Sequence, residues 1–100
     1  MPIEHLVCMK LRQPIPEERL QALYRECEAR FDRILGVLTA SMGMSWHPNP
    51  SGFTHAIVIR FEDRTKLELF MSHPDHVAAG HLLQSVFSEF LVLDYETDRP

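Results

Sequence analysis

The order of hydrophobic patterns along the chain is the feature that most restricts its fold. Residues 3–12, 37–46 and 53–61 alternate with a period of two, which predicts three strands. Residues 90–95 predict a fourth strand that is apolar on both faces. Between the first two strands, apolar residues recur at steps of three and four, which predicts a helix. Its apolar stripe consists of Leu20, Leu23, Tyr24, Cys27, Phe31 and Ile34.

A proline divides the second helical region. Asp63 is expected to cap the first part, whose apolar face is Leu67, Phe70 and Met71. Since a residue before proline is disfavoured in helical geometry, His73 ends this part and Pro74 begins a second short helix. The apolar face of that helix is expected to be Val77, Ala78, Leu82, Val86 and Phe87. The order strand, helix, strand, strand, broken helix, strand predicts an α+β, ferredoxin-like βαββαβ fold, as a single domain over residues 1–100.

Both faces of the predicted sheet are apolar. Two helical segments can cover one face, and the other is left with Leu6, Cys8, Ala56, Val58 and one set from the last strand. A solvated face of an antiparallel sheet should be polar, and a chain of 100 residues has little left to cover it. We therefore expect a homodimer in which two such faces pack together.

Charge and composition exclude several classes of protein. The net charge is −4, and the chain has no cluster of basic residues of the kind that binds nucleic acid. The order of elements and Gly52-Phe53 fit an RNA-recognition domain, but His55 stands where a second stacking aromatic would be needed. No apolar run approaches the ~20 residues of a membrane span. The N-terminus lacks the pattern of a signal peptide, so the expected compartment is the cytoplasm.

The two cysteines do not form a disulfide framework. By alternation, Cys8 points to the face of the strand opposite to that of His5, and Cys27 belongs to the apolar stripe of the first helix. If His5 faces the helices, the two thiols lie on different sides of the sheet and cannot be bridged.

Six histidines are many for this length, and three of them suggest a site. His5 and His55 lie on strands that are neighbours in this topology, and His76 follows the helix break above the same face. A buried imidazole stays neutral near pH 7 and can act as a general base. We predict that the three converge on an apolar pocket, whose ligand-contacting residues are Phe70, Tyr24, Phe53, Phe87 and His73. The alternative is that each histidine is structural and bonds a backbone carbonyl or a neighbour.

A metal site is the competing hypothesis for the same region. His73, Asp75, His76 and His81 offer imidazole and carboxylate ligands, but their spacing matches no zinc signature. The glycines are isolated and form no phosphate-binding loop, and no Gly-x-Ser-x-Gly motif is present. We therefore expect neither a metal nor a cofactor.

Several segments together resemble one family. They are Glu4-His5-Leu6-Val7, Gly52-Phe53-Thr54-His55-Ala56, Phe61-Glu62-Asp63, His73-Pro74-Asp75-His76-Val77 and Leu93-Asp94-Tyr95. Their combination resembles the stress-responsive α/β-barrel (Dabb) family, over nearly the whole chain. The resemblance implies a dimeric α+β barrel, in which two sheets close around a shared interior.

The resemblance also implies a chemistry. The family includes boiling-stable plant stress proteins and a plant polyketide cyclase whose cofactor-free aldol condensation uses a tyrosine and a histidine. That histidine falls on His76, two pocket histidines fall on His5 and His55, and the tyrosine falls on Phe70, which has no hydroxyl. The expected function is binding of a small aromatic or polyketide-like molecule, with cyclase- or lyase-like acid–base chemistry at His76 if the protein is an enzyme. The alternative is a non-enzymatic, stress-related barrel.

Overall fold

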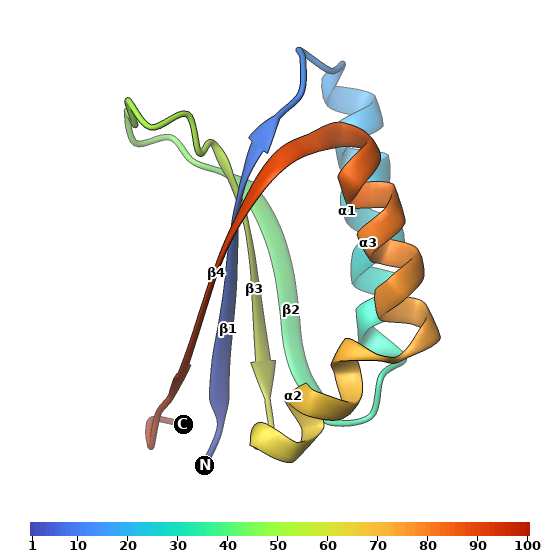
Figure 1. The fold of residues 1–100 in the computed structure, drawn as a ribbon, viewed down its shortest axis with the longest axis vertical. Helices are drawn as coiled ribbons and strands as arrows, with labels where there is room; N and C mark the ends of the chain where they lie inside the picture. The colour runs from blue at the N-terminus through green and yellow to red at the C-terminus, as the bar shows by residue number, and fades with distance from the viewer.

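The computed structural model describes residues 1–100 as a two-layer α+β arrangement. The strands are β1 (Ile3–Leu11), β2 (Val37–Met44), β3 (His55–Phe61) and β4 (Phe87–Glu96). The helices are α1 (Glu17–Asp32), α2 (Arg64–Met71) and α3 (Pro74–Val86). All three helices lie on the same side of the sheet, and the other side is bare (Figure 1). The predicted ferredoxin-like βαββαβ order with a broken second helix is confirmed.

The sheet has the strand order β2-β3-β1-β4, and every pairing in it is antiparallel. His5 lies opposite Ile59 on β3 and opposite Asp94 on β4. Met9, four residues further along β1, lies opposite His55. The predicted alternation therefore holds, with one set of side chains on each strand facing the helices. The buried members of that set are Ile3, His5, Met9, His55, Ile57, Ile59, Phe61 and Phe87.

Local chemistry explains the break between α2 and α3. The Asp63 side chain accepts a hydrogen bond from the backbone N–H of Lys66, which is an N-cap. The His73 Nδ1 accepts one from the backbone N–H of Asp75, and Pro74 takes the first position of α3. Since proline restricts the residue before it, His73 adopts an extended conformation, and α3 starts in a new direction.

Three details differ from the sequence-based expectation. Phe87, expected at the end of a helix, is the first residue of β4, and β4 continues through Glu96. On α3 the buried residues are Ala79 and Leu83, while Val77 is 44% exposed. This helix carries apolar residues on more than one face, so periodicity alone could not select the face that packs.

The third difference lies on the edge strand β2. Its pairing with β3 shifts between Val37 and Thr39, and Leu38, which a regular alternation would place on the same face as Ala40 and Met42, is 48% exposed. An extra residue in one strand leaves that residue unpaired and bends the strand. Beyond this irregularity, Ala40 and Met42 recover the expected side and pack against the core.

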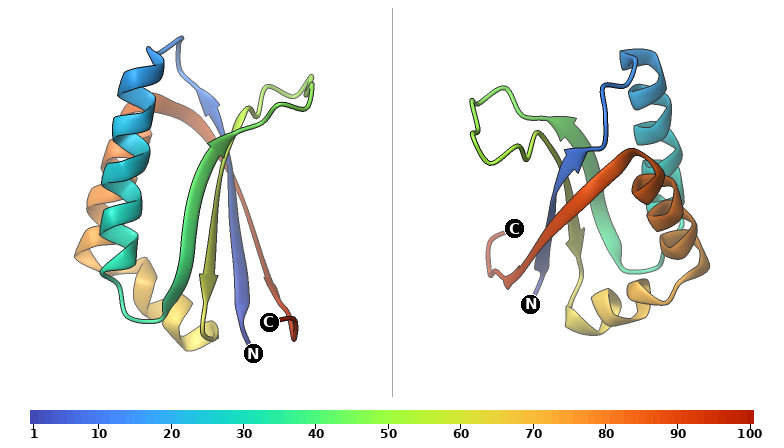
Figure 2. Two further views of the ribbon diagram at one scale, coloured as in Figure 1. Left: turned by 180° about the vertical axis from the view of Figure 1, so that it is seen from behind. Right: turned by 45° about the horizontal axis from the view of Figure 1, so that its top comes forward.

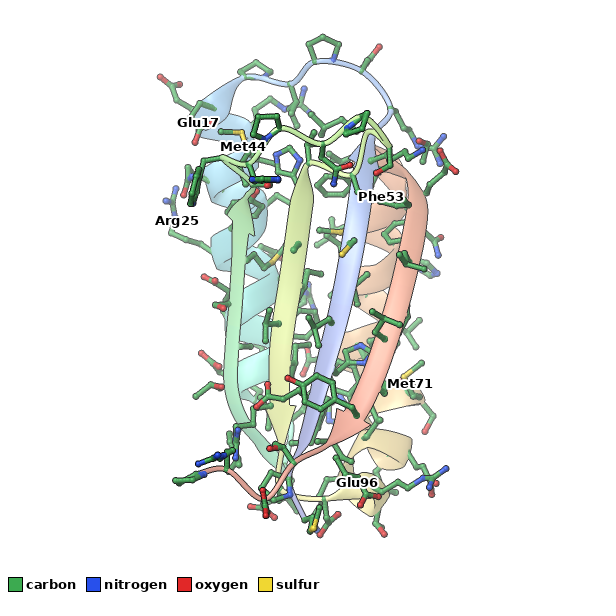
Figure 3. The ribbon with its side chains drawn as sticks, turned by 90° about the vertical axis from the view of Figure 1, so that its left-hand side faces the viewer. Glu17, Arg25, Met44, Phe53, Met71 and Glu96 are labelled. Atoms are coloured by element: carbon green, nitrogen blue, oxygen red, sulfur yellow. The ribbon has the colours of Figure 1, made fainter.

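The side of the sheet opposite the helices, which we call the outer face, is largely apolar (Figure 3). On this face, Leu91, Leu93 and Tyr95 of β4 lie directly opposite Cys8, Leu6 and Glu4 of β1. Glu4 is paired with Arg60 across β1 and β3. The loop between β2 and β3 projects away from the helices (Figure 2), and none of the helices is long and apolar enough to cross a membrane.

Candidate functional site

An apolar cavity of about 200 Å³ lies between α3 and the helix-facing side of the sheet. Its apolar walls include Val7, Ile57, Ile59, Leu83, Phe90 and Val92. The polar side chains among its lining residues are those of His76 and Gln84, both from α3. Because Gln84 and Phe90 are exposed, the cavity reaches the surface between α3 and β4. Of the histidines predicted to converge on a pocket, only His76 lines this cavity.

The imidazole of His76 is held by the helix break. Its Nδ1 lies 3.0 Å from the carbonyl oxygen of Met71, the last residue of α2. Because a carbonyl can only accept, Nδ1 carries the proton, and a neutral His76 has its lone pair on Nε2. Burial lowers the pKa of His76, the bond to Met71 opposes this shift, and the nearby His5 adds to it. His76 is therefore a neutral imidazole beside an apolar cavity.

His5 has a carboxylate partner on the neighbouring strand. Its Nδ1 lies 2.5 Å from Oδ1 of Asp94, the residue directly opposite in the β1–β4 register. The His5 ring meets the rings of Phe61 and Phe70 edge-on, with centroids 6.0 and 6.1 Å apart. Phe70 also contacts His76, at 4.4 Å between centroids. His5, Asp94, Phe61, Phe70 and His76 thus form one group, which we call the His5 end of the sheet.

Asp94 is the residue of this group that sequence reasoning missed as a functional candidate. A signal was available, because alternation along β4 places Asp94 on the same face as Phe90 and Val92. A carboxylate among apolar residues on a strand needs a partner. Which residue provides that partner depends on strand order and register, and these came only with the structure.

His55 lies at the other end of the same wall. His55 lies opposite Met9, which is four residues after His5 on β1. At 3.3 Å per residue, the two histidines are therefore about 13 Å apart along the strands. The Nδ1 of His55 lies 2.8 Å from the Thr54 hydroxyl, and its buried Nε2 has no hydrogen-bond partner in the chain. Burial lowers the pKa of His55, and Glu17 opposes the shift. The expectation that His5, His55 and His76 meet in one pocket is therefore wrong.

The predicted ligand-contacting residues also occupy other places. Tyr24, Phe70 and Phe87 are buried in the core, and burial raises the pKa of Tyr24 to about 12. Phe53 is half-buried beneath the ammonium of Lys10, which lies 4.8 Å from the ring centroid. His73 caps α3 through Nδ1. None of these five residues lines the cavity beneath α3.

Asp75 fixes the start of α3 to the end of α1. Its carboxylate accepts hydrogen bonds from Arg30 Nη1 at 3.1 Å and from Arg33 Nη2 at 2.9 Å. The hydrogen bond from Arg33 is the main cause of the lowered pKa of Asp75. Because Asp75 immediately precedes His76, this pairing holds the first turn of α3 in place over the sheet.

The residues of the competing metal hypothesis do not form a ligand set. Asp75 is occupied by the two arginines, and His76 donates to Met71. No group of three His, Cys, Asp or Glu side chains is placed to hold a metal ion. The two cysteines are free, with Cys8 on the outer face and Cys27 on the buried side of α1.

The fold and the placement of these residues can be compared with known proteins. The family model of the stress responsive A/B barrel domain (Dabb) matches residues 3–97. The chain belongs to this family. A curated Dabb relative is olivetolic acid cyclase from Cannabis sativa, which is 22% identical over 101 residues, covering 95% of this chain and 96% of the cyclase.

Solved structures confirm the ferredoxin-like fold of this Dabb domain. A hydroxynitrile lyase from Passiflora edulis has a TM-score of 0.83 at 14% identity, with 98% of this chain and 95% of the lyase covered. A dimeric protein of unknown function and ferredoxin-like fold from Bacteroides fragilis has a TM-score of 0.74 at 23% identity, with 96% of each chain covered. At these identities the likeness shows the shared fold.

Proposed function

We propose that this Dabb protein binds a small aromatic or polyketide-like molecule in the cavity beneath α3, and that His76 serves there as a general base. The observation that carries the proposal is the state of His76. It is the titratable side chain that lines the cavity, its pKa is lowered by burial, and Nδ1 is committed to Met71. A base needs an unprotonated nitrogen within reach of the proton that it removes, and Nε2 of His76 meets this need.

The names of two relatives are in keeping with an acid–base reaction. One is named a cyclase and the other a hydroxynitrile lyase, and a positioned base can serve either kind of reaction. Phe70 occupies the position that the resemblance assigns to a tyrosine, so this chain has no phenol beside His76. The Nδ1 of His5 is bonded to Asp94, and His5 does not line the cavity. Any proton transfer in this cavity therefore depends on His76.

The test of this proposal uses phenol and resorcinol as probes. Their binding is followed by chemical-shift titration of the wild-type protein, of His76→Gln and of His81→Gln. His81 is an exposed residue of the same helix that does not line the cavity. We expect saturable binding to the wild type. His76→Gln should bind about tenfold more weakly, because one hydrogen bond between neutral groups is lost, and His81→Gln should bind with unchanged affinity.

The second candidate function is a non-enzymatic, stress-related barrel with structural histidines. The bond between His5 and Asp94 favours it, because a paired and buried histidine stabilises the fold without chemistry. On this alternative, His76→Gln lowers the melting temperature and leaves phenol binding unchanged. That outcome would reject the role of His76 as a base.

We further propose that the protein is a homodimer formed through the outer face, closing into an α+β barrel. Val58, Leu91 and Leu93 are exposed on this face of the protomer, and exposed apolar patches of this kind mark interaction sites. A dimer of the same fold from Bacteroides fragilis supports the assembly. Sedimentation should give twice the 11.6 kDa mass of the chain.

A matched pair of variants tests the dimer. Leu93→Glu places a charge on the outer face, and we expect it to sediment as an 11.6 kDa species. Leu69→Glu places the same charge at an equally exposed position of α2, on the helical side, and should leave the dimer intact. A wild-type protein that sediments as a protomer at micromolar concentration would contradict the proposal.

A further inference from the structure

A glycine lies in the wall of the cavity, in the middle of α3. Gly80 is one helical turn from His76 and one turn from Gln84, and all three residues line the cavity. Positions four apart share a face of a helix. The three residues therefore form a single row that faces the space between α3 and the sheet.

Neither backbone geometry nor crowding requires glycine at this position. The glycines with positive φ are Gly36 and Gly52, so Gly80 has an ordinary helical backbone. A Cβ built at Gly80 would meet no atom within 4 Å. By contrast, a Cβ at Gly36 would lie 2.5 Å from the side chain of Lys66. Glycine inside a helix destabilises it relative to alanine, so at Gly80 the chain carries this disadvantage without a structural reason.

The space left by Gly80 separates the two polar side chains of the cavity. His76 and Gln84 are eight residues apart, about 12 Å along the axis at 1.5 Å per residue. The Gln84 side-chain amide makes no hydrogen bond within the chain, while its backbone carbonyl accepts one from Arg12. Between these two polar side chains, the walls are aliphatic or aromatic. The cavity thus has one polar point at each end and an apolar middle.

We propose that Gly80 and Gln84 are specificity-determining residues, which select a single aromatic ring with polar substituents at opposite ends. This inference rests on the proposed ligand-binding function. The ring lies against the open position of Gly80, one substituent meets Nε2 of His76, and the Gln84 amide donates to an acceptor on the other. The volume agrees, because a cavity of about 150 Å³ holds a benzene ring and this one measures about 200 Å³.

The experiment uses two phenols of the same shape. 4-Hydroxyacetophenone carries a carbonyl acceptor opposite its hydroxyl, and 4-isopropylphenol, which is similar in size, has a methyl group in place of the carbonyl oxygen. We expect the wild type to bind the ketone about fivefold more tightly, which corresponds to one hydrogen bond. Gln84→Leu should remove this preference. A preference that persists in Gln84→Leu overturns the role of Gln84.

The role of Gly80 is tested by filling the space beside it. Gly80→Ala should raise the melting temperature by about 4 to 8 °C, because alanine favours the helix, and should weaken binding of both phenols. Gly80→Leu should remain folded, since nothing lies within 4 Å of the new Cβ, and should lose at least tenfold in affinity. His81→Leu adds the same bulk at an exposed position of α3 and should bind like the wild type.

The outcomes separate this inference from the proposed function. If Gly80→Leu is folded and binds both phenols like the wild type, the inference is overturned while ligand binding stands. If the wild type binds neither phenol under conditions in which it is folded, both the ligand-binding function and the inference are overturned.

Discussion

The two ends of the helix-facing wall contain the same kind of residue in different surroundings. At the His5 end, a strand histidine bonds a carboxylate from β4 at 2.5 Å and contacts a phenylalanine that also touches His76. At the end that contains Thr54, His55 and Phe87, which we call the His55 end, the histidine bonds a hydroxyl from its own strand neighbour. The ring of Phe87 lies 5.5 Å from that of His55. The two ends thus differ in the partner of the strand histidine, which is a carboxylate at one end and a hydroxyl at the other.

The reason for the difference is the edge strand. β4 continues along β1 as far as Ile3, so at the His5 end it supplies Asp94 to the inner face. At the His55 end, the neighbouring part of β4 begins with the buried Phe87, which supplies an aromatic ring. Figure 3 shows the two ends, with Phe53 and Glu17 at one and Met71 and Glu96 at the other. Three measurements test whether the two ends behave differently.

The largest expected effect comes from removing one aromatic ring at each end. Phe70→Ala and Phe87→Ala each delete a fully buried ring and should each lower the free energy of unfolding by about 3–5 kcal/mol. Only Phe70 contacts His76, so only Phe70→Ala should raise the pKa of His76, by admitting water beside it. Urea unfolding gives the stabilities, and NMR titration of the imidazole gives the pKa. An equal change in the pKa of His76 in Phe87→Ala would show that the two ends are not independent.

A smaller effect is expected from removing the polar partner of each strand histidine. Asp94→Val leaves His5 without its acceptor and should cost about 1–3 kcal/mol of unfolding free energy. Thr54→Val removes a bond between two neutral groups and should cost about 0.5–1.5 kcal/mol. Ser88→Val reports what a new valine does at an exposed position of β4. The comparison fails if Thr54→Val is the more destabilising of the first two variants, as measured by urea unfolding.

The smallest expected effect is the pH dependence of stability. The fold lowers the pKa values of His55 and His76, mainly through burial. Below the ordinary value of about 6.5, the unfolded chain therefore binds more protons than the folded one, and the free energy of unfolding falls as the pH is lowered. The free energy of unfolding stops falling once the pH is below the lowered pKa values of the two histidines. His55→Gln should make the decline between pH 7.5 and pH 5 shallower, and an unchanged slope would argue against a lowered pKa at His55.

His81→Gln is the control for the pH measurement, because this exposed histidine has no contact with either end. Its variant should retain the slope of the wild type. Since both ends contribute to the slope, the double variant of His55 and His76 should be flatter than either single variant.

Much of the fold could be predicted because it depends on local rules. The period of two on β1 and β3, the stripe on α1 and the restriction imposed by Pro74 each act within a few residues. The predictions failed where two solutions were locally equivalent. On α3, apolar residues occupy more than one face, and packing against the sheet selected Ala79 and Leu83. On β2, one unpaired residue at Leu38 interrupted the alternation.

The candidate site divides in the same way. His76 could be identified from the sequence, because the helix break that positions it is encoded in His73-Pro74. Its position in the cavity wall and the bond to Met71 became visible only with the orientation of α3. Tyr24, Phe53 and Phe87 are aromatic and were plausible walls of a pocket, but composition cannot distinguish a residue that fills the core from one that borders a cavity.

The sequence by itself determined the order of the elements, the alternation that groups His5 and His55 with the apolar residues of their strands, and the apolar character of both faces of the sheet. These depend on steric preferences and periodicities that neighbouring residues already contain. Only the tertiary structure decided that His5 meets Asp94, that His55 lies about 13 Å from it along the strands, and that Gly80 borders the cavity between His76 and Gln84. Such contacts join residues far apart in the chain, and their distances are set by strand register and helix packing.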